Sequence, residues 1–370
     1  MRNGQRNSSI EILKLIAVFL IVLSHAIPNS GGEITESYID LSAVTIDFQQ
    51  LLLVLMKYMG QLGNDIFIVC SAFFLLESSR TKISKVISIV IDSFIISVLF
   101  LVAFIASGYN FSLTMIIKNM IPITMNTQWF VGCYLIFYLI HPALNVIVRS
   151  LSKKGLIALN ICALFIYCGI NLVIHDRFYY TQLVGFICIY FFTAYMKFYM
   201  KDFIKSKKRN VRMLVISLFM FLFSILIIDI LGLKINAFSN YLVYWSIIIN
   251  PFLIILSLTL FNLFNMKCFC NGLINYSSSL SLLIYMIHAN MLVQDYLKMD
   301  VFSWIYKNFS YKYILLWVFA VGIILFVGGF ILSVIYKETI QKLQKRISRI
   351  VFPRLKRKAS IFIERLLEIT

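Results

Sequence analysis

The first apolar segment of the chain contains three ionisable residues whose types and spacing suit acid–base chemistry. Residues 10–27 are mainly apolar, and Glu11, Lys14 and His25 interrupt them. His25 follows Lys14 by eleven positions, which in a helix places both on one face, about 16 Å apart along the axis. Glu11 lies three residues before Lys14 and can pair with it. The segment therefore predicts one helix face with a carboxylate, a cation and an imidazole, and an imidazole can take up a proton near neutral pH.

Ionisable groups inside an apolar span are costly, so these three residues are functional candidates by default. The alternative is structural, with Lys14 extending its ammonium to the membrane surface and His25 lying at the interface. The spacing alone leaves both interpretations open. We do not expect a cleavable signal peptide here, because Glu11 and Lys14 lie inside the apolar run and no small-residue cleavage site follows it.

Two further sites combine charge with an expected helix end. Lys82 and Lys85 lie three residues apart at the start of the third apolar segment. They either orient the chain in the membrane or form a cation pair that can bind phosphates. Asp65 follows Gly63 and Asn64 and can act as an N-terminal helix cap.

A late apolar segment contains His288, with Tyr285 three residues earlier on the same helix face. His288 is either a satisfied interfacial residue or part of a site. We assign a structural role to His141, which precedes Pro142. The 7 cysteines form no CxxC pair, and no metal or nucleotide fingerprint occurs, so we expect no bound metal.

The composition excludes a water-soluble globule. Hydrophobic residues make up 61% of the 370 residues, charged residues make up 14%, and the mean hydropathy is +0.88. Soluble domains have about 45–50% apolar and about 25% charged residues. The apolar runs are too long for barrel strands, so we expect an all-α polytopic membrane protein. The expected spans, about ten, lie near residues 10–27, 51–77, 84–107, 128–149, 155–174, 180–200, 212–232, 240–264, 278–295 and 313–336.

The second expected span contains Gly60, Gly63 and Asn64, which predict either a broken helix or a helix followed by a re-entrant piece. The net charge of +18 comes from 34 basic and 16 acidic residues. With the N-terminus inside the cell, 26 of the basic residues fall on inner segments and 7 on outer segments. Because Lys and Arg collect in cytoplasmic loops, we expect both termini in the cytoplasm and no nucleic-acid partner.

The last part of the chain differs from the rest. We divide the sequence into a membrane domain, 1–336, and a basic tail, 337–370. Apolar residues recur in the tail at roughly helical spacing, which predicts an amphipathic helix on the inner leaflet, broken near Pro353. A disordered basic tail is the alternative.

Five segments, in order, resemble the membrane acyltransferase type 3 family. Its opening helix has a basic residue, ten others and then a histidine, with an acid three residues before the base, as Glu11, Lys14 and His25 stand here. The basic position is more often Arg. The other four matches are GNDIFIVCSAFFLL (63–76, with Asn64 and Ala72 departing from the pattern), Lys82-Ile-Ser-Lys85, WFVGCYLIFYLIHPALN (129–145), and the set Ser281, Tyr285 and His288.

This resemblance implies an enzyme: a multi-pass protein of the cell membrane, most simply the bacterial plasma membrane, that transfers an acetyl or similar short acyl group. The implied donor is acetyl-CoA, which acts as a substrate and not as a permanently bound cofactor. The implied acceptor is a hydroxyl of an envelope or capsular polysaccharide or of its lipid-linked precursor.

The resemblance also implies roles for the residues. His25 would act as general base, or would itself take the acyl group transiently, with Lys14 and Glu11 beside it. Lys82 and Lys85 would bind the phosphates of the acyl-CoA. Residues that would position the substrates are Asp65, Ser71, Trp129, Tyr285 and His288.

Two other classes of protein remain as alternatives. A transporter or flippase for a lipid-linked sugar or polysaccharide would also have many spans and buried polar groups, although transporters often contain inverted repeats and we find none in the sequence. A membrane scaffold or sensor would need neither the polar face of residues 10–27 nor the ordered set of motifs.

Overall fold

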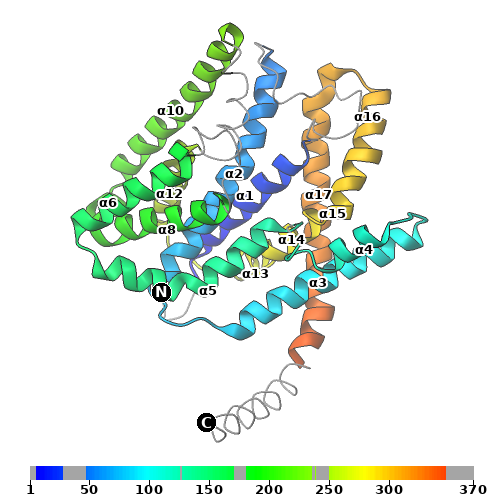
Figure 1. Cartoon of the computed structure of the whole chain (residues 1–370), viewed down its shortest axis with the longest axis horizontal. Coiled ribbons are helices and arrows are strands. Elements are labelled where there is room, and N and C mark those ends of the chain that lie inside the picture. The colour runs from blue at the N-terminus through cyan, green and yellow to red at the C-terminus, as the bar shows by residue number, and fades with distance from the viewer. Residues whose placement is uncertain are drawn as a thin grey trace, which may run out of the picture.

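A computed structural model describes residues 6–27, 47–125, 127–170, 181–235, 238 and 250–346. The secondary structure in these residues is helical and contains no strand, which confirms the all-α prediction. Figure 1 shows the helices as one bundle, with α1 (Ser8–His25) and α2 (Phe48–Leu75) side by side near its centre. Asn7 is the N-cap of α1: its side-chain oxygen accepts a hydrogen bond of 3.1 Å from the backbone N–H of Ser9.

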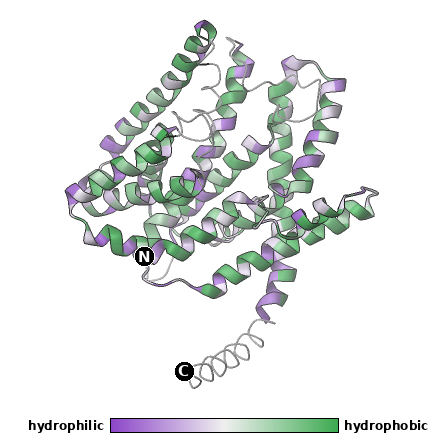
Figure 2. Ribbon diagram, in the orientation of Figure 1, coloured by the Kyte–Doolittle hydropathy of each residue, from purple (hydrophilic) through white to green (hydrophobic). Residues whose placement is uncertain are grey.

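Eight helices in the described part of the chain are long and apolar enough to cross a membrane. Figure 2 shows that hydrophobic residues, in green, dominate these helices, and many large hydrophobic side chains on them are exposed, which suits a surface in contact with lipid. The chain is therefore a multi-pass membrane protein. The eight candidates are α1, α2, α3 (Ile83–Ala106), α5 (Trp129–Ser150), Lys153–Ile170 (α6 with η1), α8 (Thr181–Tyr199), α10 (Lys207–Lys234) and Tyr311–Arg346, which contains α17 (Ile314–Tyr336).

The number of ten spans is not confirmed. The expected span 240–264 corresponds to α12 (Pro251–Asn265), and its first part lies outside the described residues. The expected span 278–295 is divided between α14 (Ser281–His288) and α15 (Met291–Tyr296). The break between α14 and α15 is polar, since Asn290 donates to Ser97 Oγ and to Asn119 Oδ1, both at 3.3 Å.

The prediction that the second span is broken is wrong, because α2 is continuous over 28 residues. Asp65 therefore lies in the middle of a helix and caps nothing. Gly60 and Gly63 permit close packing of α2 on α1: a Cβ at Gly63 would lie 2.8 Å from Ile21 Cγ1 and closer still to the Ala17 carbonyl oxygen. Small residues at a helix contact are a common device of membrane helices.

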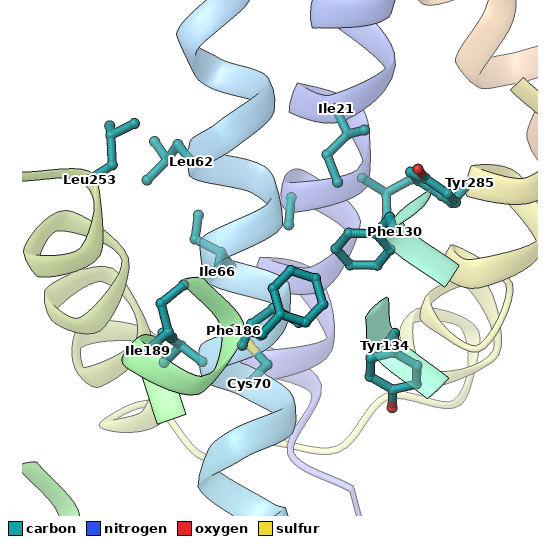
Figure 3. Close-up of a cluster of buried hydrophobic side chains, with 14 of the residues drawn as sticks. Ile21, Leu62, Ile66, Cys70, Phe130, Tyr134, Phe186, Ile189, Leu253 and Tyr285 are labelled. Carbon is teal, nitrogen blue, oxygen red and sulfur yellow. The ribbon is translucent and has the colours of Figure 1, made fainter. Parts of the chain in front are cut away.

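A hydrophobic core fills the space between α1, α2, α5 and α8. Figure 3 shows Ile21, Ile66, Phe130, Phe186 and Ile189 converging there, and each is less than a tenth exposed. The core fixes α1 against α2 and α14, so the polar side chains of α1 keep a defined position.

The C-terminal end of α2 is held by side chains from two other helices. Asn145 and Arg149 of α5 donate to the carbonyls of Leu75 and Leu76, at 3.0 and 2.9 Å. Lys197 of α8 donates to the carbonyl of Phe73 at 2.5 Å. Because these carbonyls lack partners within the helix, the contacts fix the point from which the chain continues to Lys82 and α3.

Three short helices complete the part of the fold that bears on the site: α4 (Leu113–Met120), α13 (Gly272–Ser278) and α16 (Ser303–Asn308). After α17 the helix continues through η4 (Lys337–Gln341) to Arg346, so the boundary proposed at residue 336 lies within a continuous helix. The tail beyond residue 346, with the break predicted near Pro353, lies outside the described residues.

Candidate active site

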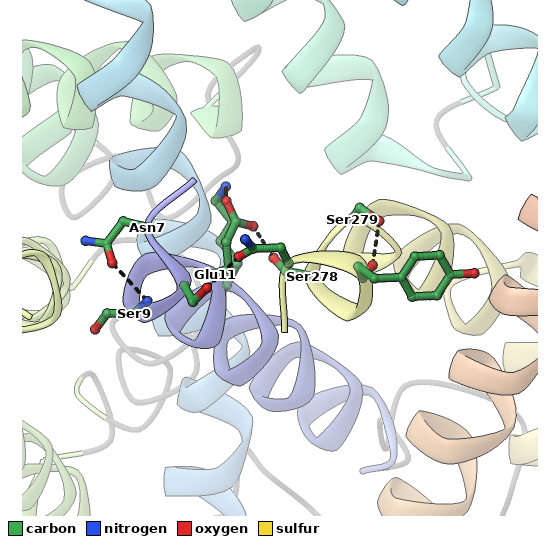
Figure 4. Close-up of polar contacts among 9 residues, drawn as sticks. Asn7, Ser9, Glu11, Ser278 and Ser279 are labelled. Atoms are coloured by element: carbon green, nitrogen blue, oxygen red, sulfur yellow. Dashed lines mark hydrogen bonds and ion pairs between the residues drawn. The ribbon is translucent and has the colours of Figure 1, made fainter. Parts of the chain in front are cut away.

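The predicted pair on the polar face of α1 is confirmed: Lys14 Nζ lies 3.1 Å from Glu11 Oε1. The other carboxylate oxygen of Glu11 accepts the hydroxyl of Ser278, at the end of α13, at 2.5 Å. Figure 4 shows Ser278 directed toward Glu11 across the gap between α1 and α13. Glu11 is thus buried with both oxygens engaged, and the carboxylate holds the lysine ammonium in place.

The other end of the same face holds His25, the last residue of α1. Its Nδ1 lies 3.1 Å from Nε2 of His288, the last residue of α14. His288 is buried, and its Nδ1 lies 2.8 Å from the carbonyl oxygen of Ile284. His25 is of intermediate exposure. Two histidines 263 residues apart in sequence therefore form one hydrogen-bonded pair.

Aromatic rings surround this pair. Tyr285 packs edge-on against His288, with centroids 5.4 Å apart, and lies 6.5 Å from the His25 ring. The Phe130 and Tyr285 rings lie next to each other in Figure 3, with centroids 5.0 Å apart, and the Phe130 centroid lies 5.7 Å from that of Phe67 of α2. These rings form a continuous line from α2 to the histidines.

A cavity of about 860 Å³ lies next to this line of rings. Phe67 and Met286 are part of its wall, so it reaches α14 two residues before His288. Glu11 and Lys14 line it as well. His25 and His288 are not among the lining residues; the Phe67 ring lines the cavity, and Phe130 and Tyr285 continue from it to the histidine pair.

Away from Met286, the cavity is lined by three exposed basic residues, Arg6, Lys85 and Lys345. We call this end the basic mouth. The three residues come from the start of α1, from α3 and from the continuation of α17, and sequence reasoning had selected only Lys85. Arg6 and Lys345 lie far apart in sequence and match no motif, so only the fold shows that they share a cavity.

The structure separates the two lysines predicted to act together. Lys85 lines the cavity, and its ammonium lies 4.6 Å from the Tyr138 ring and 3.4 Å from the Tyr134 hydroxyl. Lys82 precedes the first residue of α3, is exposed, and is not among the residues that line the cavity. Its backbone N–H donates to the Tyr138 hydroxyl at 3.2 Å.

The remaining predicted residues occupy different places. Ser71 lines the cavity. Asp65 is buried in α2 and accepts a hydrogen bond from Gln61 at 2.7 Å, away from the lining residues. Trp129 begins α5, packs on Phe130 at 5.7 Å and does not line the cavity. His141 is buried and bonds the Tyr138 carbonyl oxygen at 2.6 Å, as its expected structural role requires.

Asp92 of α3, on the cavity wall, connects the cavity to the C-terminal part of the chain. It accepts hydrogen bonds from the Tyr336 hydroxyl at 2.9 Å and from Gln341 at 2.7 Å. The sequence offers no signal for this pairing, because 244 residues separate Asp92 from Tyr336. Within the described residues, no three His, Cys, Asp or Glu side chains gather as a metal site would require.

The candidate site thus consists of a cavity with a basic mouth, a polar face on α1, and an imidazole pair that does not line the cavity. A family model described as an acyltransferase domain matches residues 7–338, most of the chain. The protein belongs to this family, the type 3 membrane acyltransferases, which confirms the resemblance in the sequence. No curated protein and no solved structure matches the chain.

Proposed function

We propose that the protein transfers an acetyl or similar short acyl group from acyl-CoA to a hydroxyl of an envelope or capsular polysaccharide, or of its lipid-linked precursor. The observation that supports this most is the cavity that is lined by three exposed cations and by Phe67, the first of the rings that lead to His25 and His288. A donor with a polyanionic head and a long thin arm fits such a shape.

The basic mouth suits the head of the donor. Arg6, Lys85 and Lys345 offer three positive charges at the surface, and a polyphosphate is attracted to them electrostatically. Arg6 can bind a phosphate through two parallel N–H donors, whereas each lysine acts as a point charge. In the predicted orientation this mouth faces the cytoplasm, where acetyl-CoA is made.

The deeper part of the cavity suits the arm that bears the thioester. Its wall combines apolar side chains, such as Phe67, Met286 and Ile10, with the polar groups of Ser71 and Lys14. Because His25 does not line the cavity, the thioester reaches the imidazole only when the side chains between them shift. Phe67 is partly exposed and can change rotamer readily, whereas Phe130 and Tyr285 are buried and move only if the packing around them loosens.

His25 is the base in this mechanism. Its imidazole takes the proton of the acceptor hydroxyl, and the hydroxyl oxygen attacks the thioester carbonyl carbon. The tetrahedral intermediate expels the CoA thiolate, which receives the proton from His25 and leaves as CoA thiol. In a two-step variant, His25 attacks the thioester itself, releases CoA and then passes the acyl group to the hydroxyl. Both routes leave His25 neutral at the end of the cycle.

The function is tested by comparing the O-acyl content of the envelope polysaccharide in cells with and without the gene. We expect ester-linked acyl groups to disappear without the protein and to return with it. A polysaccharide that keeps its acyl groups but no longer reaches the surface would instead indicate the transporter alternative.

A further inference from the structure

The hydrogen-bond partners of His25 and His288 determine which ring nitrogens carry protons. A carbonyl oxygen accepts hydrogen bonds and cannot donate, so the contact between His288 Nδ1 and the Ile284 oxygen, at 2.8 Å, places a proton on Nδ1. A neutral His288 then presents the lone pair of its Nε2. Since this nitrogen lies 3.1 Å from Nδ1 of His25, the second contact places a proton on His25 Nδ1.

This assignment also fixes the state of Nε2 of His25. With its proton on Nδ1, a neutral His25 has its lone pair on Nε2, the nitrogen that makes no bond to His288. If His288 carried protons on both nitrogens, its Nε2–H would point at His25 Nδ1, and the proton of a neutral His25 would move to Nε2. The assignment therefore depends on a neutral His288. A carboxylate bonded to either imidazole would favour the charged form, and among the described residues none makes such a bond.

The residues around His288 hold its ring in the position from which Nε2 accepts the hydrogen bond of His25. His288 is 1% exposed, and the edge of the Tyr285 ring packs against it at an interplanar angle of 88°. Its backbone carbonyl accepts a hydrogen bond from Gln294 at 2.6 Å, which also holds the end of α14 in place. The accepting nitrogen thus has little freedom to leave His25.

We propose that His288 is a positioning residue that selects the tautomer of His25 and so makes Nε2, and not Nδ1, the catalytic base. This inference rests on the proposed function, because it assumes that His25 abstracts a proton. When Nε2 takes the hydroxyl proton, the bond from His25 Nδ1–H to His288 persists, and no proton passes between the rings. His288 orients the imidazolium and stabilises it as a neutral acceptor.

Three substitutions at His288 separate this role from simple packing. His288→Gln puts an amide oxygen near the position of Nε2, where it can accept from His25. His288→Asn puts its amide near the position of Nδ1, too far from His25. His288→Met has a similar volume and no strong acceptor. The measurements are kcat and the KM for acetyl-CoA on purified protein in vesicles, with thermal unfolding as a control for folding.

We expect His288→Gln to keep kcat within about tenfold of wild type, while His288→Asn and His288→Met lose about 100-fold, the lower range for general-base catalysis. The KM for acetyl-CoA should not change, because His288 does not line the cavity.

Equal losses in His288→Gln and His288→Met, or a His288→Met enzyme with normal kcat, would overturn the positioning role and leave the proposed function intact. A wild-type protein that transfers no acyl group would overturn both. If the His288→Met protein fails to fold, the test rests on the Gln and Asn variants. Both carry an amide, but only the longer Gln side chain brings it within reach of His25.

Discussion

A single methyl group at Gly63 should disturb catalysis from a distance. In Gly63→Ala, the new Cβ would lie 2.8 Å from Ile21 Cγ1 and closer still to the backbone oxygen of Ala17, against about 3.4 Å for ordinary contact. The oxygen belongs to the helix backbone and cannot rotate away, so α1 itself must move. Relief of both contacts requires a shift of about 1 Å, and a misplacement of this size costs about 100-fold in rate.

The shift acts through His25, because α1 ends at that residue. The bond between His25 and His288 is 3.1 Å long, and an added displacement of about 1 Å lengthens it past the range of a hydrogen bond. We therefore expect kcat for acyl transfer to fall about 100-fold. The helix pair also loses packing, which we expect to lower the thermal unfolding temperature by a few degrees.

Two other glycines extend the test. Gly60→Ala would bring its Cβ within 2.6 Å of Ser24 Cβ, which is bonded to the α1 backbone and does not move when the side chain turns, so kcat should fall here as well. Gly328→Ala in α17 meets nothing within 4 Å and should leave kcat unchanged. The assay measures kcat in vesicles for all three variants. A folded Gly63→Ala protein as active as Gly328→Ala would refute the argument that the α1–α2 contact sets the position of His25.

Three further predictions concern the cavity. Lys85→Ala should raise the KM for acyl-CoA several-fold at low salt and less at high salt, whereas Lys82→Ala, outside the cavity wall, should change it little. Tyr336→Phe removes the hydrogen bond to Asp92 and the one that Gln344 donates to the Tyr336 hydroxyl, and should lower the free energy of unfolding by at least about 1 kcal/mol, measured by denaturation in detergent. Phe67→Ala shortens the line of rings beside the cavity and should increase hydrolysis of acyl-CoA without acceptor, measured as free thiol.

Each of these has an outcome that would contradict it. Equal KM values for the Lys85 and Lys82 variants would remove the distinction between a lining and a non-lining lysine. A Tyr336→Phe protein as stable as wild type would mean that these two bonds contribute nothing measurable. Unchanged thioester hydrolysis in Phe67→Ala would mean that this ring does not limit access.

The sequence predicts best where the relevant contacts are local. The apolar runs define an all-α membrane protein, and the i, i+3 spacing of Glu11 and Lys14 predicts an ion pair that the structure confirms. The error in α2 has a clear cause: glycines inside an apolar helix are equally consistent with a break and with close approach to a neighbour. Only the position of Ala17 against Gly63 distinguishes the two.

Contacts between distant parts of the chain could not be predicted. The sequence selected His25 and His288 separately, but nothing in their spacing indicates a bond across 263 residues. The same holds for Ser278 on Glu11, and for Arg6 and Lys345 at the basic mouth. The motif that joins Lys82 to Lys85 is local, yet only Lys85 lines the cavity, because Lys82 lies before the first turn of α3.

The central claim is that the imidazole of His25 performs acyl transfer. It is tested most directly by following label from radioactive acetyl-CoA into acceptor in vesicles that contain wild-type, His25→Ala or His25→Gln protein at equal levels. We predict that the wild type incorporates label into ester linkage and that both variants insert normally and incorporate none. Near-normal turnover in either variant would contradict the account.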